Sequence, residues 1–178
     1  MFSTLLCLFI WVAPINPEWR LALRRHFAQR SQSKNIQRMI DLLKHDPAPG
    51  TLMPMPSEND VMGKPLPREG CWVLVVGPLS RCAVAPLRKW EHFAQSSHKP
   101  VIVITTSSTI VAKFFQKDHH FDHLYFTSDP LIADRPIWNV FMYPRLYLLD
   151  DNGRLLWICR MPMASPRVIP DAFLGAQP

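Results

Sequence analysis

The sequence has no Cys-x-x-Cys pair, although it contains four cysteines, Cys7, Cys71, Cys82 and Cys159. Their wide spacing excludes the paired-cysteine signature of a zinc site or of a dithiol redox motif. Four dispersed cysteines also do not make a disulfide framework in a chain of 178 residues. The cysteines therefore indicate neither a structural metal nor a redox compartment.

Other signatures of enzyme sites are missing as well. The sequence has no glycine-rich phosphate loop, no Gly-x-Ser-x-Gly elbow and no constellation of paired carboxylates. These absences leave no nucleotide-binding loop, serine nucleophile or acid–base pair on which to build a function. We therefore expect no bound cofactor.

A histidine cluster, His119, His120 and His123, precedes an expected strand. Histidines three or four residues apart can share a metal on a helix face. Phe121 and Asp122 interrupt the cluster in what the pattern indicates is a loop. We expect a solvated or partner-facing loop there and no metal site.

Charge is absent from the first 13 residues, MFSTLLCLFIWVA. A membrane span needs about 20 apolar residues, and a secretory signal has basic residues before its apolar run. Here the basic residues follow the run, which would leave the next segment in the cytoplasm if the run inserts. Three interpretations stay open: a short or truncated anchor, a signal peptide with an uncharged start, and a segment packed on a protein partner.

Acidic residues are scarce near the N-terminus. Residues 1–45 contain seven basic and two acidic residues, a net charge of +5, whereas residues 46–178 carry +1. Residues 18–30 and 34–45 set narrow apolar stripes against basic faces, as helices at a membrane surface or on a partner do. We expect a membrane contact through residues 1–30, a protein partner and no nucleic acid; a merely solvated helix face is the alternative.

Proline is abundant, with 18 residues, about twice the usual share. Many of these prolines lie just after the basic arm. They predict a linker over residues 46–61, between an N-terminal arm, residues 1–45, and a globular domain, residues 62–178. The hydrophobic share of 48% is enough for a core in that domain.

The globular part begins with a strand, a helix and a second strand. Residues 71–77 and 100–105 are short, β-branched apolar runs, which is typical of strands covered on both faces. Between them, residues 80–96 have a helical apolar stripe, with Ser80 as a candidate N-cap. This order predicts a right-handed βαβ unit. Pro86 lies inside the helix, where proline costs about 3 kcal/mol.

The second half of the globular part continues with a helix and a strand and then ends in a β-hairpin. Residues 108–117 predict an amphipathic helix and residues 123–127 a third strand. Two apolar runs, 145–150 and 154–160, flank Asp151-Asn152-Gly153, and Asn-Gly between such runs is a strong hairpin signal. The fold class predicted is therefore α/β, with a mixed sheet, flanking helices and a C-terminal β-hairpin.

This order resembles the thioredoxin-like superfamily, over about two-thirds of the chain. The segment GCWVLVVGPLSRCAVAP resembles the strand-to-helix junction of AhpC/TSA-like proteins, where a reactive cysteine begins the helix and a proline follows within it. The segment MYPRLYLLDDNGRLLW resembles the stretch in which a cis-proline precedes the hairpin, and VMGKPLPREG resembles the lead-in to the first core strand. An arm before such a domain is similar to the membrane-anchored TlpA and MauD branch. The resemblance implies that Cys82 is the candidate thiol and Pro144 the candidate cis-proline.

The sequence departs from the family pattern at residues around Cys82 and Pro144. Pro86 falls four residues after Cys82, which places Cys82 nearer the second, less exposed cysteine position of the dithiol members. A peroxiredoxin would have Thr or Ser three residues before its cysteine, where this chain has Leu79. Tyr143 replaces the small or β-branched residue usual before the cis-proline, and its larger ring would partly cover the site.

Cys82 has the surroundings of a reactive thiol. A cysteine at a helix N-terminus faces the positive end of the helix dipole and free N–H groups, which favour the thiolate, and Arg81 is adjacent. Cys71 and Cys159 lie in expected strands, where small buried hydrophobic residues are common. We expect a membrane-associated redox protein that works through Cys82, on a cytoplasmic or periplasmic face that the sequence leaves open. The alternative is a redox-inactive docking subunit of the same fold.

Overall fold

The computed structural model describes residues 37–38, 40–67, 70–141, 143–159, 166–170 and 173. The chain divides into two compact units, Met1–Lys44 and His45–Pro178. In the first unit the described residues 37–38 and 40–43 are helical, within the predicted helix. The apolar run and the first predicted arm helix lie outside the described residues. No described helix has the length and apolar character needed to span a bilayer.

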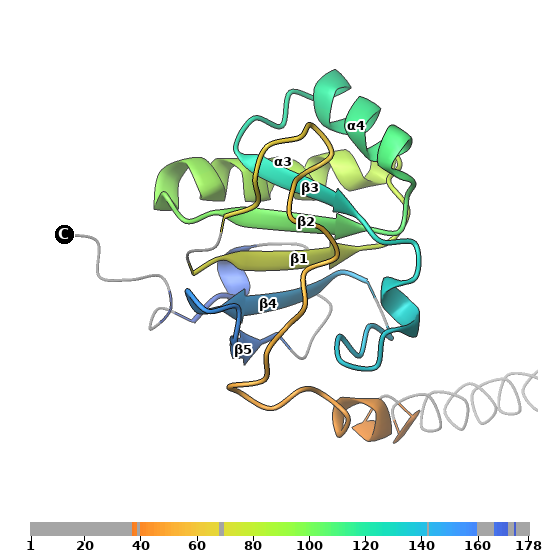
Figure 1. Ribbon diagram of the computed structural model, residues 1–178, viewed down its shortest axis with the longest axis vertical. Helices are drawn as coiled ribbons and strands as arrows, with labels where there is room; N and C mark the ends of the chain where they lie inside the picture. Colours follow the sequence, from red (N-terminus) through yellow and green to blue (C-terminus); the bar gives the residue numbers. More distant parts are fainter. Residues whose placement is uncertain are drawn as a thin grey trace, which may run out of the picture. The chain divides into compact units, whose positions relative to one another are not determined.

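Five strands form one mixed sheet in the second unit. They are β1 (Trp72–Val76), β2 (Val101–Thr105), β3 (Leu124–Ser128), β4 (Arg145–Leu149) and β5 (Leu155–Ile158). Their order across the sheet is β3-β2-β1-β4-β5 (Figure 1). β2 is parallel to β1 and β3, whereas β4 is antiparallel to β1 and β5. This topology confirms the predicted α/β fold, with its βαβ unit and its hairpin.

The central strands are the most apolar ones. Every residue of β2 is buried, as are four of the five residues of β1. Such strands have no solvent face, so their side chains need not alternate between apolar and polar. The two continuous apolar runs in the sequence thus become the middle of the sheet.

Two helices cover one face of the sheet. Helix α3 (Arg81–Ser97) connects β1 to β2 and buries Leu87, Trp90 and Ala94 behind the sheet (Figure 1). Helix α4 (Thr109–Asp118) connects β2 to β3, and its Phe115 packs on the same apolar cluster. The hydroxyl of Ser108 caps α4 by accepting a hydrogen bond from the Val111 N–H at 3.5 Å.

The opposite face is covered mainly by irregular chain. Residues 46–67 cross in front of the sheet (Figure 1) and bury Met53 and Leu66. Residues 129–141, which include the short helix η1 (Ile132–Asp134), add Trp138. The segment that the prolines predict as a linker therefore supplies part of the core.

The hairpin between β4 and β5 turns through Gly153, whose φ is +72°. Asp150 Oδ1 accepts hydrogen bonds from the backbone N–H groups of Asn152 and Arg154, both at 2.8 Å. Asp151 Oδ1 accepts a third hydrogen bond from the Gly70 N–H at 2.6 Å. Asp150 thus closes the turn, as carboxylates commonly do, whereas Asp151 ties the turn to the chain before β1.

Two cysteines predicted within strands lie just beyond them. Cys71 precedes β1 and Cys159 follows β5, and both are buried. The Cys71 N–H still donates to the Leu149 carbonyl at 3.2 Å, and the Cys159 N–H donates to the Leu146 carbonyl at 2.9 Å. Backbone pairing therefore extends past the strand ends, which explains why the apolar pattern continues to these residues.

Candidate functional site

Cys82 is the exposed cysteine of the described chain. It occupies the first turn of α3, whereas Cys71 and Cys159 are buried. The spacing to Pro86 places Cys82 nearer the less exposed cysteine position of the dithiol members, and in this chain the residue at that position is exposed. The reason is geometric: residue 82 lies on a side of α3 away from the inward-facing Leu87, Trp90 and Ala94.

The loop before Cys82 is tied to the loop after β2. The Thr105 hydroxyl donates to the Gly77 carbonyl at 2.9 Å, and the Leu79 N–H donates to the Ser107 hydroxyl at 2.8 Å. The Ser107 N–H in turn donates to the Thr105 hydroxyl at 3.1 Å. These bonds fix the point at which α3 begins, and with it the position of Cys82.

The start of α3 favours an anion. Ser80 has the extended backbone of an N-cap residue, but its hydroxyl makes no capping hydrogen bond, and the first turn contains no acidic residue. The helix dipole therefore meets no protein carboxylate in that turn. Arg81, exposed next to Cys82, adds a positive charge.

Tyr143 and Pro144 reach this end of the sheet from the far side of the sequence. Arg145 pairs with Val75, so the start of β4 lies beside the end of β1. The peptide bond between Tyr143 and Pro144 is cis. The two residues line one apolar groove with Ala83 and others from the β1–α3 junction, whereas Cys82 is not among its lining residues.

The groove has a volume of about 150 Å³. Its lining is apolar: Leu74, Val76, Ala83, Pro86, Leu87 and Trp90 contribute to it with Gly77, Pro78, Tyr143 and Pro144. An apolar cavity of about that size holds a ring such as benzene. The groove therefore has room for one apolar side chain of a bound polypeptide.

Tyr143 closes one side of the groove. A Cβ atom built on Gly77 would lie 3.3 Å from Tyr143 Cδ2, so the ring lies closely over the glycine. Partial burial raises the pKa of the Tyr143 hydroxyl, and the nearby negative charge of Asp134 raises it further. Tyr143 is thus a neutral, partly exposed wall of the groove.

A buried ion pair holds the strand that follows Pro144. Arg145 Nη2 lies 2.6 Å from Asp46 Oδ1, and the two side chains are 0% and 4% exposed. Asn139 Nδ2 donates to the same carboxylate oxygen at 2.7 Å. The Arg145 guanidinium also stacks over Phe141, with 4.7 Å to the ring centroid. Asp46 therefore anchors both ends of the segment that carries the cis-proline.

The sequence gives little sign of this ion pair. Asp46 and Arg145 are 99 residues apart, and Asp46 lies at the start of the proline-rich stretch. The one signal in the sequence is an arginine in an otherwise apolar strand, because a buried arginine needs a partner. That signal predicts a carboxylate but does not identify which one.

The other described cysteine sites are unsuited to exchange chemistry. Burial raises the pKa of the Cys71 thiol to about 12, which keeps it protonated near neutral pH. Cys159 is 6% exposed. Burial keeps both thiols from contact with a partner, so the structure assigns neither residue to the candidate site.

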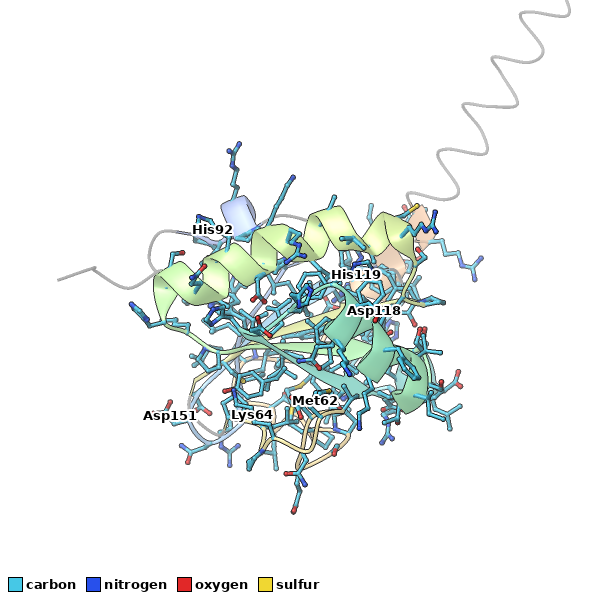
Figure 2. All side chains as sticks on the ribbon, turned by 90° about the horizontal axis from the view of Figure 1, so that it is seen from above. Met62, Lys64, His92, Asp118, His119 and Asp151 are labelled. Carbon is cyan, nitrogen blue, oxygen red and sulfur yellow. The ribbon has the colours of Figure 1, made fainter. Side chains whose placement is uncertain are left out.

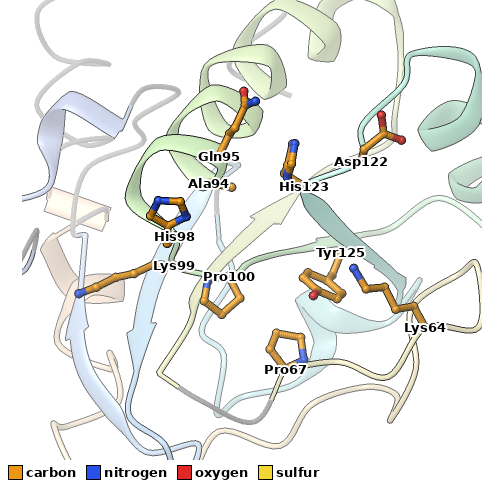
Figure 3. Close-up of a pocket in the computed structure, with 10 residues that line it drawn as sticks. All are labelled: Lys64, Pro67, Ala94, Gln95, His98, Lys99, Pro100, Asp122, His123 and Tyr125. Carbon is orange, nitrogen blue, oxygen red and sulfur yellow. The ribbon is translucent and has the colours of Figure 1, made fainter.

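The three clustered histidines do not converge. His119 contacts Phe115 edge to face, with ring centroids 4.7 Å apart, and His120 has a positive φ of 49°. His123 lines a separate cleft with His98 and Lys64, shown in Figure 3. The described residues contain no group of three or more His, Cys, Asp or Glu side chains that would hold a metal ion.

The cleft of Figure 3 lies at the opposite end of the sheet from Cys82. Pro100 precedes β2 and His123 precedes β3, at the amino ends of the parallel strands, whereas Cys82 follows the carboxyl end of β1. Lys64 lies over the Tyr125 ring at 4.3 Å, and Lys99 Nζ donates to the Phe173 carbonyl at 3.1 Å. This cleft is therefore not part of the thiol site.

Comparison with known proteins gives matches at the level of structure. No family model and no curated protein matches the chain. A thiol peroxidase from Chromobacterium violaceum matches with a TM-score of 0.53 and 17% identity, over 71% of this chain and 82% of that one. A peroxiredoxin-like protein from Aquifex aeolicus matches with a TM-score of 0.54 and 13% identity, over 66% and 78%.

An uncharacterized conserved protein from Geobacillus kaustophilus matches with a TM-score of 0.50 and 12% identity, over 69% of this chain and 75% of that one. Together with the sheet order and the helix start beside a cis-proline, these neighbours show that the second unit of this chain has a thioredoxin-like fold.

Proposed function

We propose that the protein exchanges disulfides with a partner protein through the single thiol of Cys82. The supporting observation is that Cys82 is exposed in the first turn of α3, next to an apolar groove that Tyr143 and Pro144 line. The fold is shared with a thiol peroxidase and a peroxiredoxin-like protein, which supports a thiol-based activity. Leu79, where a peroxiredoxin would have Thr or Ser, favours a disulfide over a peroxide as substrate.

The reaction is a thiol–disulfide exchange. The Cys82 thiolate attacks one sulfur of a partner disulfide, and a bond forms between the two sulfurs. The partner's own sulfur–sulfur bond breaks, and its second sulfur leaves as a thiolate that takes a proton from water. Among the described residues Cys71 and Cys159 are buried and offer no second exposed thiol. A thiol of another molecule then attacks the mixed disulfide and releases Cys82.

The second candidate function is docking without redox chemistry. It is favoured by one observation: Cys82 is absent from the lining of the groove, which is apolar and narrowed by Tyr143. A groove of this kind would bind an apolar side chain of a partner whether or not a thiol reacted beside it. The two candidates differ in what they require of Cys82.

A comparison of two cysteine positions on α3 tests the proposal. Ala85 is exposed one turn further along the helix, so the double variant Cys82→Ser/Ala85→Cys presents a thiol without the helix start. We expect Cys82 to react with a peptide disulfide at least about tenfold faster than the cysteine at position 85. Equal rates, with an unperturbed circular dichroism spectrum, would favour the docking function instead.

We further propose that residues 1–30 attach the protein to a membrane. The support is in the sequence: an uncharged apolar start followed by a segment rich in basic residues. Cosedimentation with anionic lipid vesicles tests it. We expect the full chain to sediment with the vesicles and a chain beginning at residue 45 to stay in the supernatant. Equal partitioning of the two would refute the attachment.

A further inference from the structure

The exposed side of α3 is basic. Its exposed basic residues are Arg81, Arg88, Lys89 and His92. The helix has one acidic residue, Glu91, whose Oε1 accepts hydrogen bonds from the backbone N–H groups of Asp122 and His123, at 3.0 and 2.9 Å. That carboxylate therefore lies on the β3 side of the helix, toward which Arg88 also turns, with its Nη1 donating to the His120 carbonyl at 3.4 Å.

Part of this surface is hollowed into a cleft between α3 and the short helix η2 (Pro166–Val168). Its volume is about 560 Å³. Four of its lining residues have basic side chains: Arg88, Lys89, His92 and Arg167. Phe93 and Pro166 add apolar surface, and none of the described lining residues is acidic. Figure 2 shows His92 on the outer side of α3, beside η2. We call this site the basic cleft.

The basic cleft adjoins the thiol site along one face of α3. Cys82, Pro86, Lys89 and Phe93 follow one another at spacings of four, three and four residues, which places them on one side of a helix. Pro86 lines the apolar groove, whereas Lys89 and Phe93 line the basic cleft. With a rise of 1.5 Å per residue, Lys89 lies about 10 Å along the helix from Cys82.

We propose that the basic cleft binds an acidic segment of the partner protein whose cysteine reacts with Cys82. Binding of the acidic segment follows from the cleft itself, whereas the link to Cys82 rests on the proposed function. An extended chain advances about 3.3–3.6 Å per residue. The acidic side chains therefore lie about three or four residues from the partner's reacting cysteine.

The shape of the cleft favours a polypeptide. A planar membrane surface does not enter a concavity between two helices, whereas single side chains do. The glutamate side chain has an apolar stem and an anionic end, which suit Phe93 and the surrounding cations respectively. Arginine also pairs with carboxylates in a two-pronged geometry that adds specificity. A polynucleotide, which offers phosphates instead, is a competing ligand that the test must exclude.

Fluorescence anisotropy with the full chain tests the binding. The probes are a glutamate-rich peptide without cysteine, a glutamine version of equal length, and a single-stranded oligonucleotide of equal charge. We expect the acidic peptide to bind at least about tenfold more tightly than the glutamine peptide, and binding to weaken towards 1 M salt, where the Debye length is about 3 Å. Tighter binding of the oligonucleotide, or equal binding of both peptides, would overturn the proposal.

Charge reversal locates the site. We expect Lys89→Glu and Arg167→Glu each to weaken acidic-peptide binding about tenfold, since each replaces attraction with repulsion. Lys113→Glu is the matched control, because Lys113 is exposed on α4 and outside the cleft. We expect it to change the dissociation constant less than about twofold. An equal loss in the control would mean that net charge and not the cleft governs binding.

A peptide series separates this proposal from the function on which it partly rests. Each peptide carries one cysteine in a mixed disulfide with thiopyridine; Cys82 attacks the peptide sulfur and thiopyridine leaves. We expect glutamates three or four residues from that cysteine to accelerate the exchange about tenfold, and glutamates far along the peptide to have less effect. Exchange that is fast but independent of glutamate refutes the cleft alone. Tight acidic-peptide binding without exchange refutes the thiol function alone.

Discussion

At the scale of single residues, burial raises the pKa of the Cys71 thiol and the Tyr147 hydroxyl. The exposed Cys82 and the buried Cys71 are the same chemical group in two environments. Burial raises the pKa of Cys71 from its ordinary value of 9.0 to about 12 because the thiolate would lose its hydration. The same cause raises the pKa of Tyr147 to about 12, against an opposing effect of the Arg145 charge.

These raised values predict a loss of stability in alkali. The unfolded chain releases the Cys71 proton near pH 9, whereas the folded chain holds it to about pH 12. The stabilisation is therefore complete below pH 9 and is lost as pH rises from 9 to 12, by at most about 1.4 kcal/mol per pH unit for each group. Urea denaturation at several pH values between 7 and 11 would measure how the free energy of unfolding falls with pH. We expect Cys71→Ala to flatten this slope; an unchanged slope in Cys71→Ala would contradict the assignment.

The Asp46–Arg145 pair makes a second residue-scale prediction. Removing one partner of a buried ion pair leaves the other charged and unpaired, which costs about 3–5 kcal/mol. We therefore expect Asp46→Ala to lower the free energy of unfolding by about that amount, measured by chemical denaturation. Lys44→Ala, which breaks an exposed pair with Asp41 at 2.9 Å, is the control and should cost about 0–1 kcal/mol. A similar loss of unfolding free energy in both variants would show that the buried pair stabilises the fold no more than the exposed pair does.

At the scale of secondary structure, most elements follow from apolar periodicity. The runs around Val73 and Ile102 are too short and too β-branched for helices, and both become central strands. Asn152-Gly153 marks the hairpin because its turn needs a positive φ, which glycine adopts without strain. The central strands and the hairpin turn can be predicted because neighbouring residues in the sequence determine them.

Helix α3 contains Pro86, although proline has a low propensity for helix interiors. Pro86 has no N–H to donate to the carbonyl of Cys82, four residues earlier, and it lines the apolar groove. We expect Pro86→Ala to raise the free energy of unfolding by about 1–3 kcal/mol, because the helix regains that hydrogen bond. Thermal denaturation followed by circular dichroism would measure it.

The control for this change is Pro136→Ala, in an exposed loop. There the proline mainly restricts the unfolded chain, so its removal should lower stability by about 0.4–1 kcal/mol. The two variants thus have opposite expected signs. If Pro86→Ala also destabilises the protein, packing of the proline ring in the groove outweighs the lost hydrogen bond.

At the scale of the whole molecule, contacts distant in sequence escape prediction. The groove forms because Pro144 and Ala83 meet across the sheet, and only a family resemblance suggested that meeting. The proline-rich stretch has a composition typical of a linker, yet Met53 is 2% exposed and Asp46 pairs with Arg145. Neither residue belongs to a periodic pattern, so no local signal indicates that it is buried.

Two truncations test where the folded domain begins. A chain starting at residue 45 keeps the whole second unit, and we expect its melting temperature to match that of the full chain. A chain starting at residue 62, where composition alone places the boundary, loses Met53 and Asp46. Loss of a buried methionine costs about 2–5 kcal/mol, and an unpaired buried arginine costs about 3–5 kcal/mol. Because a domain of this size is stable by only about 5–15 kcal/mol, the shorter chain should be largely unfolded by circular dichroism. Equal stability of the two fragments would show that residues 45–61 only connect the arm to the fold.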